Sequence, residues 1–187
     1  MLNNGDLGGR VTIVSGSSSS TLTISNVQAS DAGTYNVETT GSCNTATQSA
    51  TLAVNSSPPT ITLSSNTASM WPPNHNYHTF QVTDFVASAS SCDGTVNANT
   101  VIIDHVTSDE VNLDNDMVIA CDRKSAQLRA DRDSGGDGRV YTIYFKATDS
   151  HGNSTTVTAT VTVPKNQSGE AVVDSGPHAV VINATCP

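Results

Sequence analysis

Nine of the seventeen acidic residues of this chain fall between Asp104 and Asp137, in a spacing that could bind a metal ion. Calcium takes six to eight hard oxygen ligands, which clustered Asp, Glu and Asn side chains in loops supply. The calcium-ligand candidates are Asp104, Asp109, Glu110, Asp114 and Asp116. The spacing of an EF-hand loop is absent, and a solvated acidic loop that keeps the module soluble is an equal alternative.

Five histidines offer a second kind of site, because neutral imidazole is a common zinc ligand. His75 and His78 lie three residues apart after a Pro-Pro turn, where a loop could bring them together. His105 or His151 would complete three ligands and leave an open position for water. Zinc or another divalent metal would turn that water into hydroxide, so these four histidines are catalytic candidates for a small hydrolase. The spacing H-E-x-x-H is absent, and a structural role for His75 at the turn is the alternative.

Three further patterns carry weaker chemical signals. Neither G-x-S-x-G nor a catalytic cysteine signature is present, which disfavours nucleophilic catalysis. Trp71, the only tryptophan, could stack on sugar rings as a ligand-binding residue, but a core or turn-packing role is the preferred interpretation. Five basic residues alternate with acidic ones along the sequence, which favours cross-strand ion pairs over phosphate binding. These are Arg123, Lys124, Arg129, Arg132 and Arg139.

The four cysteines are widely spaced, and none lies in a C-x-x-C pair. In a β-rich acidic chain this pattern favours disulfides over a metal knuckle. We predict a disulfide between Cys92 and Cys121, which bracket a continuous β-rich segment. Cys43 and Cys186 then form a long-range bridge or remain thiols. Four cysteines allow three connectivities, and spacing alone does not choose among them.

The net charge of −9 over 187 residues limits the partners. Sequence-independent binding of nucleic acid needs a basic face, which this chain lacks, and an anionic membrane surface is disfavoured for the same reason. No apolar run approaches the roughly 18 residues of a membrane span. The Ser/Thr-rich, Lys-poor composition is typical of an extracellular or cell-surface protein, although the first residues have no signal-peptide pattern.

The elements that must position these side chains are strands. Apolar and polar residues alternate with period two in residues 21–25, 50–54 and 157–163, and residues 140–145 are rich in β-formers. Gly-, Ser- and Asp-rich turn signals separate these runs. Short strands at this spacing predict an all-β sandwich or barrel.

A linker with paired prolines, residues 55–59, marks the predicted domain boundary, because proline cannot donate to a strand ladder. The predicted division is therefore residues 1–55, residues 56–164 and a C-terminal tail. The tail, residues 165–187, contains one possible strand.

Residues 22–35, LTISNVQASDAGTY, resemble the E–F corner of an immunoglobulin-like domain. In its Asp-x-Gly-x-Tyr run, the hydroxyl of Tyr35 hydrogen-bonds back to the chain and holds strand F to the turn. The resemblance is to bacterial extracellular repeats and covers about residues 10–54. Val37 stands where strand F usually has a cysteine, and nothing before residue 10 can supply strands A to C. The resemblance therefore implies a partial domain with strands D to G only.

A partial sandwich exposes an apolar face and open strand edges. We therefore predict a homo-oligomer in which another copy of the chain covers that face. Packing of the face against the second domain of the same chain is the alternative.

Residues 60–164 resemble a second immunoglobulin-like sandwich, a repeat found near the C-termini of secreted bacterial proteins. The resemblance rests on residues 70–75, 128–132, 138–143 and 147–153. That family is generally an accessory module beside catalytic or adhesive domains, so the resemblance implies no activity.

The sequence thus predicts an all-β chain with two immunoglobulin-like β-sandwiches, one partial and one near-complete. The leading function is a non-catalytic extracellular module that spaces, adheres or stabilises, with structural calcium as an option. One alternative is a small metal-dependent hydrolase with histidine ligands. Another is a carbohydrate-binding module that uses Trp71 on a polysaccharide or cell-surface partner.

Overall fold

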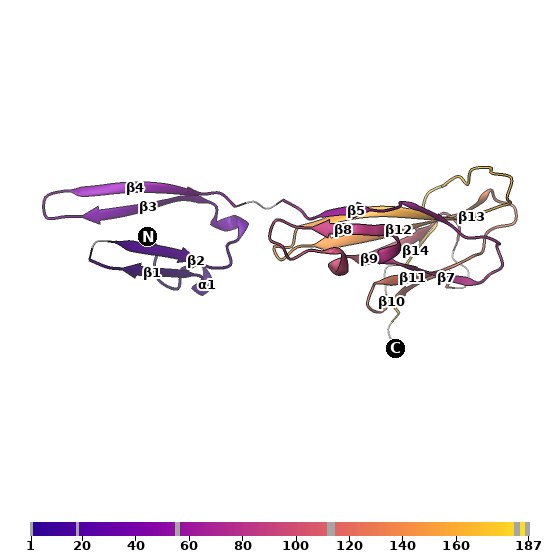
Figure 1. Ribbon diagram of the computed structural model, residues 1–187, viewed down its shortest axis with the longest axis horizontal. Helices are drawn as coiled ribbons and strands as arrows, with labels where there is room; N and C mark the ends of the chain where they lie inside the picture. Colours follow the sequence, from indigo (N-terminus) through magenta and orange to yellow (C-terminus); the bar gives the residue numbers. More distant parts are fainter. Residues whose placement is uncertain (1, 18, 55–56, 112–114, 182–183, 186–187) are drawn as a thin grey trace. The chain divides into compact units, whose positions relative to one another are not determined.

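The computed structural model describes residues 2–17, 19–54, 57–111, 115–181 and 184–185, and its elements are mainly β-strands (Figure 1). The chain divides into two compact units, Met1–Ser56 and Ser57–Pro187. Unit 1 contains α1 (Asp6–Gly9), β1 (Val11–Ser15), β2 (Ser20–Ile24), the 3₁₀ turn η1 (Ala29–Asp31), β3 (Gly33–Thr40) and β4 (Thr45–Leu52).

Unit 1 consists of two antiparallel hairpins, because each pair of strands is joined by a short polar turn. In the first, β1 pairs with β2 and Val11 lies opposite Ile24. In the second, β3 pairs with β4 and Gly33 lies opposite Leu52. The connection from β2 through η1 to β3 is the segment that the sequence identifies as an E–F corner.

The predicted tyrosine corner is confirmed. The hydroxyl of Tyr35 donates a hydrogen bond to the backbone oxygen of Asp31 at 2.6 Å. The buried carboxylate of Asp31 accepts from both terminal nitrogens of Arg10, with Nη2 at 2.9 Å, and from the backbone N–H of Gln28 at 2.8 Å. Since Arg10 directly precedes β1, this ion pair joins the first hairpin to the corner of the second.

Unit 2 contains most of the strands. They are β5 (Thr60–Leu63), β6 (Thr67–Ser69), β7 (Tyr77–Gln81), β8 (Val86–Ser90), β9 (Ile102–Ser108), β10 (Met117–Ala120), β11 (Ser125–Arg129), β12 (Gly138–Thr148), β13 (Ser154–Pro164), β14 (Ala179–Val181) and β15 (Ala184–Thr185). A helical turn, α2 (Val82–Phe85), and a 3₁₀ turn, η2 (Ala98–Thr100), complete the unit.

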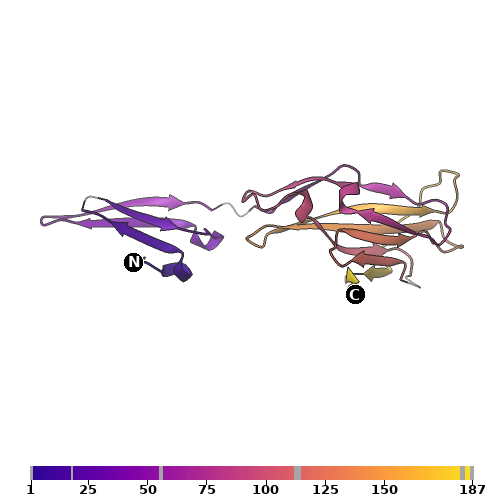
Figure 2. The ribbon, with the colours of Figure 1, turned by 60° about the horizontal axis from the view of Figure 1, so that its bottom comes forward.

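Two main sheets form the layers of unit 2, as the two ribbon views show (Figures 1 and 2). One has the order β14-β9-β12-β13-β6 and the other the order β15-β10-β11-β7. A further pair, β5 with β8, is antiparallel. The pairs β13–β6 and β10–β15 are parallel, and the other pairs in the two main sheets are antiparallel.

The core of unit 2 lies between these layers, because alternate residues of each strand face inward. Along β12 the inward residues are Tyr141, Ile143, Phe145 and Ala147, all fully buried. They join buried side chains of β9, β10, β11 and β13 in one cluster. The alternating run predicted at residues 157–163 lies in β13, where valines face this core and threonines the other side.

The segment after residue 164, expected as a tail with one possible strand, adds a strand to each main sheet. β14 pairs with β9 and β15 pairs with β10. No helix in the described part of the chain is long and apolar enough to cross a membrane.

The predicted disulfide between Cys92 and Cys121 is wrong. Cys43 and Cys92 are exposed and carry thiols. Cys92 follows β8, and Cys121 follows β10 in a different sheet, so the continuous stretch of sequence between them does not bring them together. Cys186, the remaining cysteine, lies outside the described residues.

We predict that the stability of unit 1 falls in acid because of Asp31. The hydrogen bond from Arg10, followed by that from the Gln28 backbone, lowers the pKa of Asp31 from its ordinary 3.8 to about 2. A lowered folded-state pKa stabilises the fold above the unfolded pKa, and that stabilisation is lost as pH falls from 3.8 towards 2. Denaturant unfolding at several pH values, followed by the NMR signals of the Tyr35 ring, measures the slope.

The variant Asp31→Asn has no carboxyl at this position and should lose that part of the pH dependence. Asp6→Asn, in the same unit but outside the corner, is the matched control and should keep it. An equal slope in all three proteins would contradict the assignment to Asp31.

Candidate functional site

Asp149 organises the turn between β12 and β13. Its Oδ1 accepts hydrogen bonds from the backbone N–H groups of His151 and Asn153, both at 2.9 Å, and its Oδ2 accepts from the Asn153 amide at 3.0 Å. The amide of Asn153 is the largest cause that lowers the pKa of Asp149. Gly152 has φ of 85°, a left-handed conformation that glycine adopts readily. These contacts fix the positions of Ser150 and His151.

Asp93, on the loop that follows β8, reaches this turn. Its Oδ2 accepts from the Ser150 hydroxyl at 2.6 Å and from the Ser150 backbone N–H at 3.2 Å. Its Oδ1 accepts from the hydroxyl and backbone N–H of Thr95, at 2.7 and 3.0 Å, and from the Ser91 hydroxyl. These bonds, with that of Ser150 the largest, hold the pKa of Asp93 well below its usual range.

Asp93, Asp149 and His151, here called the Asp93 cluster, have ligand atoms within 4.8 Å of one another. In the part of the chain that the structure describes, no other group of three His, Cys, Asp or Glu side chains meets this geometry. Two carboxylates and an imidazole are donors that a divalent cation accepts. Both oxygens of Asp93 already accept bonds from two loops, so the cluster also acts as a clamp between them.

The same turn brings together a serine, a histidine and an aspartate, but not as a catalytic triad. A triad needs one ring nitrogen of the histidine on the serine and the other on the aspartate. Here Nδ1 of His151 faces both partners, Ser150 Oγ at 3.3 Å and Asp93 Oδ2 at 3.2 Å. Because Ser150 also donates directly to Asp93, no path leads from the serine through the imidazole to the acid.

The structure places the other three histidine candidates on separate elements. His75 precedes β7 and its Nδ1 lies 3.1 Å from a carboxylate oxygen of Asp131. His78 lies within β7, opposite Leu128. His105, on β9, stacks on Tyr144 with 3.9 Å between ring centroids. Among the described residues, His151 alone of the four candidates belongs to a group with metal-ligand geometry.

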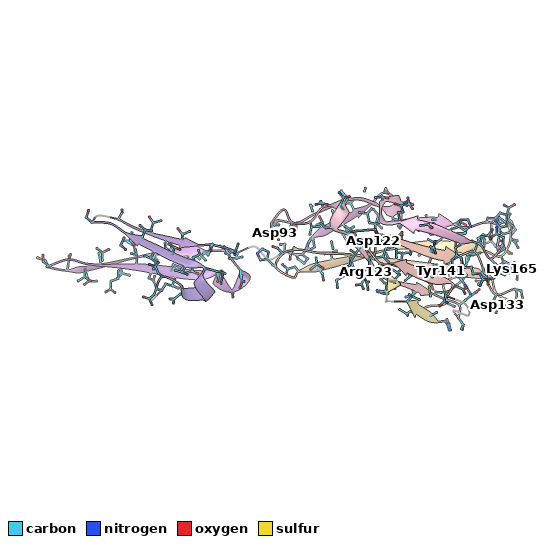
Figure 3. All side chains as sticks on the ribbon, turned by 90° about the horizontal axis from the view of Figure 1, so that it is seen from below. Asp93, Asp122, Arg123, Asp133, Tyr141 and Lys165 are labelled. Carbon is cyan, nitrogen blue, oxygen red and sulfur yellow. The ribbon has the colours of Figure 1, made fainter. Side chains whose placement is uncertain are left out.

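The opposite end of unit 2 is held by Arg139, buried on β12; Figure 3 labels Asp93 at one end of the unit and Asp133 at the other. Nη1 of Arg139 donates to Asp116 Oδ2 at 2.7 Å and to the Tyr141 hydroxyl at 2.9 Å, and Nε donates to Glu110 Oε2 at 2.9 Å. These four residues are here called the Arg139 network. Burial disfavours the charge of Arg139, but its bonds outweigh burial and raise its pKa.

Tyr141 completes the Arg139 network. Its hydroxyl donates to the backbone oxygen of Arg129 at 2.8 Å, so it both accepts and donates inside the core. Burial, the largest cause, raises the pKa of Tyr141 to about 12, and the phenol stays neutral at ordinary pH. A buried ion pair of this kind is stable only where its remaining hydrogen-bonding groups are satisfied.

The calcium-ligand candidates are held mainly by cations and backbone N–H groups. Glu110 and Asp116 bind Arg139, and Asp109, buried, accepts from the backbone N–H of Val140 at 2.7 Å. Asp104 lies on β9, where its Oδ2 is 2.8 Å from Nδ1 of His105. Asp114 lies outside the described residues. In the described part of this set, the carboxylates are not grouped around one point.

The interleaved basic residues are only in part the ion pairs that the sequence predicts. Arg129 and Arg139 both contact Asp116. Arg123 donates to the backbone oxygen of Asp104 at 2.8 Å, and Lys124 donates to the backbone oxygen of Val101 at 2.6 Å. Both side chains thus satisfy carbonyl groups near the start of β9.

Trp71 is 41% exposed, so of the two preferred interpretations, a core role and a turn-packing role, the core role is wrong. It lies between β6 and β7 and precedes Pro72 through a cis peptide bond. Its neighbour Met70 fills the core instead. Tyr77, at the start of β7, is also exposed, and its hydroxyl donates to the backbone oxygen of Asn115 at 3.1 Å.

Asp93 is not among the site residues that the sequence predicts. An Asp-Gly pair followed by Thr predicts a turn, and Asp93 does accept from the Thr95 backbone as such turns do. Nothing in the local sequence indicates that a residue 57 positions later, Ser150, would share its carboxylate.

Comparison with known proteins identifies the fold of unit 1. Residues 3–54 match the immunoglobulin I-set domain. The match includes the tyrosine corner and all four strands of unit 1, and the predicted all-β, immunoglobulin-like fold is confirmed. The bacterial and extracellular origin stays a prediction.

Among solved structures, the chain is similar to titin domains z1z2 in complex with telethonin. The identity is 22%, the TM-score is 0.43, and the likeness covers 87% of this chain and 75% of that one. No curated protein matches the chain.

We predict that Arg139→Met destabilises unit 2 by about 3–5 kcal/mol, because it leaves the buried carboxylate of Asp116 with only the longer contact to Arg129 and removes the cation beside the partly buried Glu110. Arg129→Met is the matched control. It removes a longer, 3.4 Å contact to the same Asp116 and should cost about 1 kcal/mol. Urea unfolding followed by Trp71 fluorescence reports unit 2, which holds the only tryptophan. Equal losses in the two variants would contradict a dominant role for Arg139.

Proposed function

We propose that this chain is a non-catalytic immunoglobulin-like module of a secreted bacterial protein, where it acts as a spacer, adhesion or stabilising domain. The I-set match of residues 3–54 supports the module, and the Ser/Thr-rich composition supports an extracellular setting. The observation that carries the proposal is the hydrogen bonding of Asp93.

Both carboxylate oxygens of Asp93 accept hydrogen bonds from the module itself. The donors belong to two loops that are 57 residues apart, so the carboxylate connects the loop after β8 to the turn after β12. A general base or nucleophile needs an oxygen that is directed at a substrate. The hydrogen bonds of Asp93 thus hold two loops of unit 2 in place.

A second candidate, a small metal-dependent hydrolase, rests on the Asp93 cluster. Its three ligand atoms lie close enough together to bind one cation, which would displace hydroxyl donors such as Ser150. Zinc at this position would supply a metal-bound hydroxide. Calcium, which prefers oxygen ligands, would instead stabilise the two loops without adding a reaction.

We predict that purified protein shows no chelator-sensitive turnover on a panel of ester and phosphoester substrates, because the Asp93 cluster is bonded internally. Elemental analysis of the same sample identifies any bound metal. If added calcium raises the melting temperature but no turnover is detected, the result agrees with a non-catalytic module. A chelator-sensitive rate that His151→Ala abolishes, with the circular dichroism spectrum intact, would establish the hydrolase instead. His105→Ala, outside the cluster, is the control and should keep any such rate.

A third candidate, a carbohydrate-binding module, rests on the exposure of Trp71 and Tyr77. An exposed indole ring can stack on the apolar face of a sugar. We expect polysaccharides to leave Trp71 fluorescence unchanged, since the spacer proposal needs no ligand there. A saturable shift of Trp71 fluorescence would favour this third candidate if a separate binding assay agrees. In that assay, Trp71→Ala should abolish polysaccharide binding and Tyr77→Ala should weaken it.

A further inference from the structure

Strand β15 is held to the four-stranded sheet by very little backbone pairing. It contains two residues, Ala184 and Thr185, which pair in parallel with Ile119 and Ala120 of β10. Parallel pairing is slightly weaker per residue than antiparallel pairing, and strands are usually longer than two residues. Two parallel pairs therefore give β15 little stability of its own, and a further interaction at this edge would explain its position.

The register of β10 and β15 leads to two cysteines. Ile119 lies opposite Ala184, and Ala120 lies opposite Thr185. One residue further along each strand, the sequence has Cys121 and Cys186. Neighbouring strands lie about 4.7–4.9 Å apart, and the Cα atoms of a disulfide are usually about 4.4–6.8 Å apart. A register that continues for one residue would thus bring the two cysteines within disulfide distance.

The states of the other cysteines point to the same pair. Cys121 is disulfide-bonded, whereas Cys43 and Cys92 carry thiols. The chain has four cysteines, so Cys186 is the remaining partner within one copy. Spacing in the sequence does not indicate this pair, because four strands, β11 to β14, lie between the two cysteines.

We propose that Cys121 and Cys186 form a disulfide that fastens β15 to β10 and completes the edge of the four-stranded sheet. The two thiols lose two protons and two electrons to a disulfide oxidant, such as oxidised glutathione, which is released as two thiols. This inference stands apart from the spacer function, since the connectivity of the cysteines decides it without any assay of function.

The bond makes the stability of unit 2 depend on the redox conditions. It closes a loop of about 65 residues, and in the chain-entropy model a cross-link over such a loop restricts the unfolded chain and stabilises the fold. Cys121 is exposed, so a thiol reductant can reach the bond while the unit stays folded. Such a bond persists in an oxidising compartment and is lost where thiols are kept reduced.

Peptide mapping of the unmodified chain tests the pairing directly. The protein is oxidised with glutathione, its remaining thiols are alkylated, and the chain is cleaved before aspartate residues without reduction. This cleavage places the four cysteines in separate peptides, residues 31–83, 84–92, 116–121 and 174–187. We expect 116–121 to be linked to 174–187 and the cysteines of 31–83 and 84–92 to be alkylated.

Cys186→Ser removes one partner of the bond, and Cys92→Ser, in the same unit, is the matched control. Cys186→Ser should lower the melting temperature of unit 2, followed by Trp71 fluorescence, by about 5–15 °C, because the loop is no longer closed. A reductant should lower the melting temperature of the unmodified chain and of Cys92→Ser by a similar amount. It should leave that of Cys186→Ser unchanged.

Hydrogen exchange shows whether the bond holds β15 in particular. After reduction, the amides of Ala184 and Thr185 should exchange faster, because only two residue pairs then hold the strand. The amides of β12 and β13, which lie in the other main sheet, should keep their protection.

Several outcomes would overturn the proposal. A link between 84–92 and 116–121 would pair Cys121 with Cys92, and a product of twice 19.3 kDa on a non-reducing gel would place the bond between two copies. Alkylation of all four cysteines after oxidation would show that no bond forms. An equal effect of reductant on Cys186→Ser and the unmodified chain would assign the stabilisation to another group. If Cys186→Ser fails to fold, the peptide map of the unmodified chain decides the question.

Discussion

The antiparallel pairing of β12 with β13 is the interaction on which the rest of unit 2 depends. Eleven residue pairs run from Gly138 opposite Pro164 to Thr148 opposite Ser154. This ladder decides which side chains face the core, because a slip of one residue would turn a strand's buried side chains outward. β9 joins one edge of the pair and β6 the other, and the four-stranded sheet covers the inner face. The layered structure is thus arranged around one long hairpin.

The two polar clusters occupy the opposite ends of that hairpin. The turn that begins at Asp149 carries the Asp93 cluster, and Arg139, one residue into β12, carries the Arg139 network. At each end, carboxylates accept hydrogen bonds from backbone N–H groups or from a guanidinium. Without these carboxylates, the fold would leave those donors unsatisfied. The Arg10–Asp31 pair has the same role in unit 1. Ionisable groups that look chemically active in the sequence therefore connect loops and strands in the structure.

Local patterns were enough to predict part of this structure. The alternation in residues 157–163 and the Asp-x-Gly-x-Tyr run each involve neighbours in the chain, so β13 and the bond from Tyr35 to Asp31 follow from sequence. The partners of Asp93 and Arg139 come from residues far along the chain, and no local pattern encodes such distances. The pairing of Cys92 failed for the same reason, since it depends on which sheet each cysteine joins. Met70 is buried in the core while its neighbour Trp71 is exposed, and which of the two faces inward depends on how this turn packs and not on residue type alone.

The two C-terminal strands set an order of events for a chain that is made from its N-terminus. β14 pairs with β9 and β15 with β10, across more than sixty intervening residues, so both sheets of unit 2 stay incomplete while these residues are still inside the ribosome. Until then, β9 and β10 each present an edge that a neighbouring nascent chain could occupy. Synthesis must therefore outpace or avoid such encounters, and the exposure of these two edges ends when β14 and β15 emerge and pair.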